Sequence, residues 1–134
     1  MNRTQARENA FILLFEAECR DDETALEIFE YAEQVKEFEI NDYVKNVFFG
    51  VNERRKEISE LIDANTVGWA KKRISPVSRA ILALATFEML ALDDVPGRVS
   101  INEAIELSKK YDDDKSYVFV NGVLNAIAEA LAVK

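Results

Sequence analysis

The sequence predicts an all-α protein of about seven helices, arranged as two small bundles that share one compact fold. Apolar residues recur at the three- and four-residue spacing of an amphipathic helix along almost the whole chain. Only four glycines and two prolines occur among 134 residues, so helix breakers are rare. No segment has the pattern of a β-strand. These observations together favour a helical fold.

The first half of the chain predicts three helices. The first covers about residues 4–19, with alanines and leucines on one stripe. Asp21 and Asp22 offer N-caps for the second helix. Asn41 caps a third, long helix that continues to about Ile62. The expected inward-facing residues of the second helix are Ala25, Leu26, Phe29, Ala32 and Val35.

The middle of the chain predicts a short element and then a buried helix. Residues 67–73 have the pattern of a short amphipathic turn or helix that holds Trp69. Ser75 and Pro76 begin the next helix, because proline at the first helical position loses no needed donor. From there to about Leu92 the helix is apolar on nearly every side, which is typical of the buried centre of a bundle.

Two helices follow a break at Pro96 and Gly97. Ser100 and Glu103 have the spacing of a capping box, in which the serine bonds forward and the glutamate reaches back. The last helix is expected from about residue 115 to 133. We predict one domain over residues 1–134, with an N-terminal subbundle of about 1–64 and a C-terminal subbundle of about 65–134.

Charge is unevenly distributed along the chain. The net charge is −8, and residues 1–64 hold 8 basic and 16 acidic side chains, while residues 65–134 hold 9 of each. The acidic excess therefore lies wholly in the first half. Such a surface repels a polyanion, so any nucleic-acid site must be a local basic patch.

Several kinds of chemistry have no residues to support them. The chain has no histidine, a single cysteine (Cys19) and isolated glycines, so histidine catalysis, a zinc cluster and a phosphate-binding loop are not expected. We predict a protein that is not an enzyme and uses no cofactor or metal. The N-terminus lacks the apolar core of a signal peptide and residues 80–85 are too few to span a bilayer, so we expect a cytoplasmic protein without a membrane partner.

Three stretches, in this order and spacing, resemble the NusB family of bacterial transcription antitermination factors. The first is Ala6-Arg7-Glu8 with Phe15 closing the same helix, and the second is Trp69 followed by the segment 76–88. The third is the most specific: Val95-Pro96, SINEAIELSKKY at 100–111, and Phe-Val-Asn-Gly-Val-Leu at 119–124. The resemblance covers essentially the whole chain.

The resemblance implies a helical fold of two small bundles and a function without catalysis. Proteins of this family bind boxA, a short single-stranded signal in ribosomal-RNA leaders, jointly with the small-subunit ribosomal protein NusE. The assembly keeps RNA polymerase resistant to termination. The same function, partners and antitermination complex are therefore expected for this chain, in support of ribosomal-RNA transcription.

The resemblance also implies site residues. A basic helix start and the surroundings of the Phe-Val-Asn-Gly motif bind RNA in the family, and the matching positions here are Arg3, Arg7, Lys115, Tyr117, Phe119 and Asn121. The matching partner-binding positions for NusE are Phe15, Ser78 and Arg79. Arginine pairs with phosphate and aromatic rings stack on unpaired bases, so these residue types suit the task.

The sequence also allows other interpretations of several residues and of the function. Phe119 also fits the apolar stripe of the last helix, and Asn121, Gly122 and Trp69 also fit structural roles. The protein could be a protein-only adaptor, or a homodimer that hides its RNA face, with weak RNA binding. A further hypothesis is a NusB-like domain that precedes a methyltransferase. The end of the sequence at Lys134 argues against this hypothesis.

Overall fold

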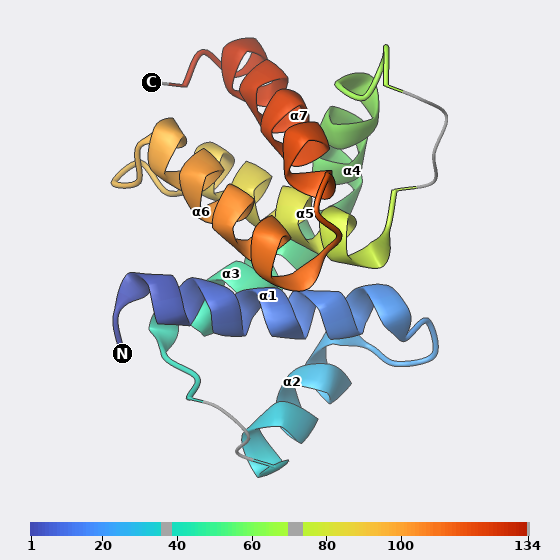
Figure 1. Cartoon of the computed structure of the whole chain (residues 1–134). Coiled ribbons are helices and arrows are strands. Elements are labelled where there is room, and N and C mark those ends of the chain that lie inside the picture. Colours follow the sequence, from blue (N-terminus) through green and yellow to red (C-terminus); the bar gives the residue numbers. More distant parts are fainter. Residues whose placement is uncertain (36–38, 70–73, 134) are drawn as a thin grey trace.

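The computed structural model describes residues 1–35, 39–69 and 74–133, and in that part of the chain it contains seven α-helices and no strand (Figure 1). This confirms the predicted all-α class. The helices are α1 (Arg3–Cys19), α2 (Ala25–Val35), α3 (Asp42–Glu53), α4 (Arg55–Ala64), α5 (Pro76–Ala91), α6 (Gly97–Tyr111) and α7 (Ser116–Ala130).

Helix α5 is the centre of the molecule, as its apolar sequence predicts. It packs against α1, α3, α4, α6 and α7, and eleven of its sixteen residues are buried. Its start follows the predicted pattern, because Ser75 Oγ accepts a hydrogen bond from the Ser78 backbone N–H at 3.0 Å and Pro76 takes the first helical position. Glu88 is the single fully buried carboxylate among the described residues of this helix.

Helix α2 differs from the prediction in its N-cap and in two of its expected inward-facing residues. Its start is closed by Thr24, not by Asp21 or Asp22: the Glu27 backbone N–H donates to Thr24 Oγ1 at 3.1 Å, and the Thr24 N–H donates to the Glu27 side chain at 3.0 Å. This is a capping box placed two or three residues later than the aspartates would put it. Leu26 and Val35 face solvent, with 56% and 41% of their surface exposed, because only one side of this short helix contacts the core.

The long third helix predicted from Asn41 to Ile62 is divided into α3 and α4. Asn41 caps α3 as expected, since its Oδ1 accepts from the Val44 N–H at 3.0 Å. Arg54 leaves the helical conformation, with φ −104° and ψ 21°, and ends α3. The continuous apolar stripe gives no signal for this break, and both α3 and α4 contact α5.

Helix α6 corrects the predicted capping box. The helix begins at Gly97, directly after Pro96, and not at Ser100. Proline at this place already has a φ of −60°, which suits a helix start. Ser100 and Glu103 lie inside the helix, where their side chains bond to other helices instead of capping their own.

For the segment before α5, the sequence predicts a short turn or helix over 67–73. Val67 and Gly68 form a turn in which Gly68 has a φ of +93°, and the Trp69 N–H donates to the Thr66 carbonyl at 3.1 Å. Residues 70–73 of the prediction lie outside the described part of the chain.

One cluster of buried apolar residues contains members of all seven helices. It is formed mainly where α1, α3, α6 and α7 pack around the central helix α5 (Figure 1). The predicted division into subbundles near residue 65 stays a prediction. No helix in the described ranges is long and apolar enough to cross a membrane.

Candidate nucleic-acid interface

Arg7 is the first candidate RNA contact, and the structure places it in the interior. Its side chain is 3% exposed, and its Nε donates to Oε2 of Glu88 at 2.9 Å. Glu88 is fully buried and accepts two further hydrogen bonds, from the Tyr43 hydroxyl at 2.6 Å and from Ser100 Oγ at 2.8 Å. One carboxylate therefore joins α1, α3 and α6 to α5.

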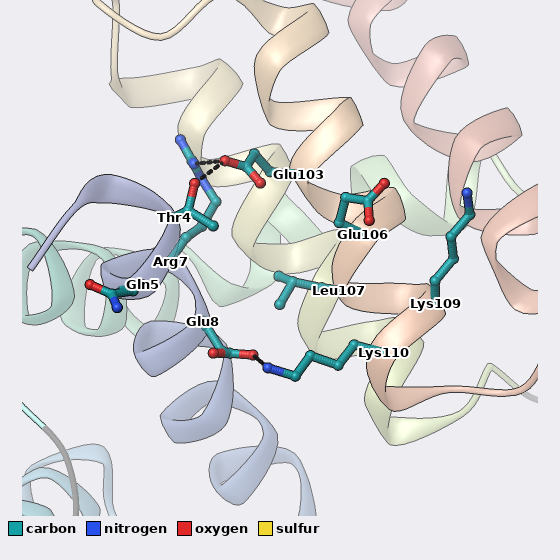
Figure 2. Close-up of a pocket in the computed structure, with 9 residues that line it drawn as sticks. All are labelled: Thr4, Gln5, Arg7, Glu8, Glu103, Glu106, Leu107, Lys109 and Lys110. Carbon is teal, nitrogen blue, oxygen red and sulfur yellow. Dashed lines mark hydrogen bonds and ion pairs between the residues drawn. The ribbon is translucent and has the colours of Figure 1, made fainter.

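A second carboxylate extends this network toward the surface. Glu103 Oε1 accepts from Arg7 Nη1 at 3.0 Å and from Thr4 Oγ1 at 2.6 Å (Figure 2). Burial by itself lowers the pKa of the Arg7 guanidinium, but Glu88, Tyr43 and Glu103 more than offset this and hold it above its usual value. Arg7 is thus a fixed cation between two carboxylates. Its RNA contact stays a prediction.

Tyr43 is part of the same network and was not among the predicted site residues. Burial raises the pKa of its phenol far above 10, and the neighbouring Glu88 carboxylate raises it further. The ring also makes a cation–π contact with the exposed Arg3, whose guanidinium carbon lies 4.5 Å from the ring centroid. Arg3 is therefore oriented at the start of α1 while its charge remains accessible.

Lys115 and Tyr117 lie at the start of α7. Lys115 is exposed, and its backbone N–H donates to Asp113 Oδ1 at 2.9 Å. Tyr117 is half-buried, and the Lys109 ammonium lies 4.9 Å from its ring centroid. The structure therefore places a lysine of α6 beside the predicted aromatic contact of α7.

Phe119 and Asn121 have structural contacts of their own. The ring of Phe119 is edge-on to Trp69, with centroids 5.3 Å apart. A Cβ at Gly122 would lie 2.4 Å from Trp69 Cζ2, so this glycine makes room for the indole. Asn121 is exposed, and its carbonyl and Oδ1 accept from the Asn125 amide at 2.8 and 2.9 Å. Trp69 thus packs against α7, while 39% of it stays exposed.

The predicted partner-binding residues occupy different surroundings. Phe15 is half-buried on α1, with its ring 6.3 Å from that of Phe11. Ser78 is buried, and its Oγ donates to Asp112 at 2.8 Å. Arg79 is half-buried beside Asp63, with 3.4 Å between Nη2 and Oδ1. Of the three, Phe15 and Arg79 retain surface that a partner could contact.

A pocket of about 410 Å³ lies between the first half of α1 and the second half of α6 (Figure 2). Its walls are formed by Thr4, Gln5, Arg7, Glu8, Glu103, Glu106, Leu107, Lys109 and Lys110. Arg7 alone among these was a predicted site residue. The rest come from the segment SINEAIELSKKY and its facing turn on α1, whose helical spacing could have pointed to one shared face.

The pocket is closed on one side by an ion pair between the two helices. Glu8 Oε2 accepts from Lys110 Nζ at 2.5 Å and from the Tyr111 hydroxyl at 2.8 Å. The hydrogen bond from Lys110 lowers the pKa of the Glu8 carboxyl, against the opposing effect of burial. Burial and the hydrogen bond to Glu8 raise the pKa of the Tyr111 phenol. No group of carboxylates or thiols within the described residues is arranged to hold a metal ion.

The predicted RNA residues therefore form two groups and not one patch. Arg3 and Arg7 lie at α1 beside Tyr43, whereas Tyr117 and Lys115 lie at the start of α7. The walls of the α1–α6 pocket include Arg7 of the first group and Lys109, which contacts Tyr117 of the second.

Comparison with known proteins identifies a family. The NusB family model matches residues 4–129. The transcription antitermination protein NusB of Clostridium perfringens is 42% identical over 131 residues, which cover 95% of this chain and 96% of that protein. The structure of T. maritima NusB superposes with a TM-score of 0.82 at 34% identity, over 96% of this chain and 92% of that one. A crystal structure of the antitermination factors NusB and NusE in complex with double-stranded RNA gives a TM-score of 0.81 at 30% identity, over 96% of both chains.

Proposed function

The chain belongs to the NusB family, and from this premise we propose that it binds single-stranded boxA-type RNA together with NusE. In this role it promotes antitermination of ribosomal-RNA transcription by RNA polymerase in the cytoplasm. It acts by binding and not by catalysis. The observation that carries the proposal is the match over 96% of both chains to a NusB that was crystallised with NusE and RNA.

The RNA surface that we propose begins at the start of α1 and continues at the start of α7. Arg3 supplies an exposed cation, and Lys115 and Tyr117 supply a cation and a ring. The buried Arg7 has both carboxylate partners inside the protein, so we propose that it holds α1 in place for Arg3. Phe119 and Asn121 lie on the same helix as Tyr117 and complete this surface. Phe15, Ser78 and Arg79 are the proposed contacts for NusE.

The test is a fluorescence-anisotropy titration of labelled boxA RNA, beside a scrambled RNA and a duplex, with and without NusE. We expect weak boxA-selective binding that strengthens with NusE. Arg3→Ala should lower the affinity and reduce the slope of log K against log salt by about 0.7, one phosphate contact on a single strand. Equal, negligible binding to all three RNAs with NusE present would overturn the proposal.

A protein-only adaptor is the second candidate, and the interior position of Arg7 favours it. With that guanidinium occupied by Glu88 and Glu103, the start of α1 offers RNA one arginine in place of two. In this case NusE should bind the chain with unchanged affinity whether or not RNA is present. Sedimentation of the chain alone would reveal a homodimer that covers the same surface.

A further inference from the structure

The α1–α6 pocket has three cations and three carboxylates in its walls, so it is locally neutral on a chain whose net charge is −8. Two of the cations form ion pairs within the protein. Arg7 pairs with Glu88 and Glu103, and Lys110 pairs with Glu8. A phosphate approaching the pocket would compete with these carboxylates for both side chains.

Lys109 is the third cation, and its situation differs. It is exposed, and no ion pair involves it in the ranges that the structure describes. Its ammonium lies over the Tyr117 ring at 4.9 Å, and Figure 2 shows the side chain turned away from Lys110, toward α7. An aromatic face attracts a cation without neutralising it, so the charge stays available to a phosphate.

We infer that Lys109 is a phosphate contact for single-stranded RNA, oriented by Tyr117, and that the RNA backbone crosses the α1–α6 pocket between Arg3 and the start of α7. This inference rests on the proposed function and extends it to α6. It follows from position, because the pocket lies between the two groups of predicted RNA residues and Lys109 contacts the second. Lysine binds phosphate as a compact point charge, which a flexible strand can approach from several directions.

Glu106 allows a second, independent test of the inference about Lys109. It lines the same pocket one helical turn before Lys109, and it too has no ion pair in the described part of the chain. A phosphate held by Lys109 would be repelled by this carboxylate. The inference therefore requires opposite effects from two neighbouring substitutions: loss of Lys109 weakens RNA binding, and neutralisation of Glu106 strengthens it.

The experiment measures boxA binding by anisotropy, with NusE present, for Lys109→Ala, Glu106→Gln and the control Lys56→Ala. Lys56 is an exposed lysine of α4, and its neighbour Arg55 faces Glu18 at the opposite end of α1, so the control removes the same charge far from the pocket. We expect Lys109→Ala to weaken binding about five- to tenfold and to lower the salt slope by about 0.7. Glu106→Gln should tighten binding, and Lys56→Ala should leave it nearly unchanged.

Thermal unfolding of each variant checks that the fold is retained, and Lys109→Gln provides a second neutral variant if alanine disturbs the helix. Unchanged affinity and slope for both Lys109 variants, with normal binding by the unaltered chain, would overturn the inference and leave the proposed function standing. An equal loss of RNA affinity for Lys56→Ala would show that Lys109 acts only through the net charge of the chain. That result would also overturn the inference. Failure of the unaltered chain to bind boxA with NusE would overturn both.

Discussion

Arg7 and Glu88 form the contact on which the arrangement of α1 depends. Both side chains are almost fully buried, and the pair is satisfied by hydrogen bonds from Tyr43 and Ser100 to the same carboxylate. A buried ion pair adds little net stability when it forms, because both charges lose water. Removing one partner is costly, because the other charge stays buried without compensation.

Arg7→Ala should therefore lower the free energy of unfolding by about 3–5 kcal/mol. Urea unfolding followed by circular dichroism measures this directly. The matched control is Arg3→Ala, which removes an exposed arginine four residues earlier on α1 and should cost no more than about 1 kcal/mol. Equal losses for the two variants would contradict the interior position of Arg7.

The ends of the helices show how local signals compete. Asn41 and Ser75 cap their helices as the sequence predicts. At α2 three residues compete for the same role, and Thr24 takes it because Glu27 lies three positions later and can return the hydrogen bond. At α6 the spacing of Ser100 and Glu103 suited a capping box, but both side chains bond to other helices.

Thr24→Ala should reduce stability by about 1 kcal/mol, the usual cost of a lost N-cap. Asp22→Ala serves as the control and should change stability little, because this exposed aspartate makes no capping bond to α2 in the structure. Thermal unfolding gives the overall loss, and hydrogen exchange of the α2 amides locates it. The reverse ranking of the two variants would show that Asp22 begins the helix.

At the scale of the whole molecule, α1 is held to the C-terminal helices by polar contacts at the rim of the apolar core. Thr4 and Arg7 meet Glu103, and Glu8 meets Lys110 and Tyr111. Phe11 packs on Tyr111, with ring centroids 4.9 Å apart. The N-terminal helix and α6 thus form one unit, and the candidate RNA surface lies across both.

The Glu8–Lys110 contact makes this unit sensitive to acid. The pKa of Glu8 lies below 4.5 in the folded chain, so the carboxyl binds a proton more tightly when the chain is unfolded. Its contribution to stability is complete above the ordinary pKa and is lost as the pH falls through the lowered value. Glu8→Gln should therefore reduce stability at neutral pH and flatten the decline in stability as the pH falls from the ordinary glutamate pKa through the lowered one.

The measurement is the midpoint of urea unfolding across this pH range, compared with Glu60→Gln. Glu60 is an exposed carboxylate of α4 that makes no ion pair in the described residues. If the stability of Glu8→Gln declines with falling pH as steeply as that of the unaltered chain, the result would argue against a stabilising Glu8–Lys110 ion pair. So would an identical flattening in the Glu60 variant.

The all-α class, the approximate position of most helices and the buried centre at α5 could be predicted from the sequence, because these features depend on local periodicity and on caps within one turn. Asn41, Ser75 and Pro76 act on their own helices and needed no tertiary information. The Phe-Val-Asn-Gly motif and SINEAIELSKKY indicated the family in the same way, as order along the chain.

Tertiary structure decided which face of each helix meets which neighbour, and with it the roles of the site residues. Arg7 and Arg3 are similar cations on one helix, but Arg7 faces Glu88 from α5 and Arg3 faces solvent over Tyr43 from α3. Lys109 became a candidate RNA contact because its ammonium lies over the ring of Tyr117 from α7. Such contacts join residues far apart in the chain. Their energies depend on burial and on the charge of the facing side chain, and neither quantity is contained in local spacing.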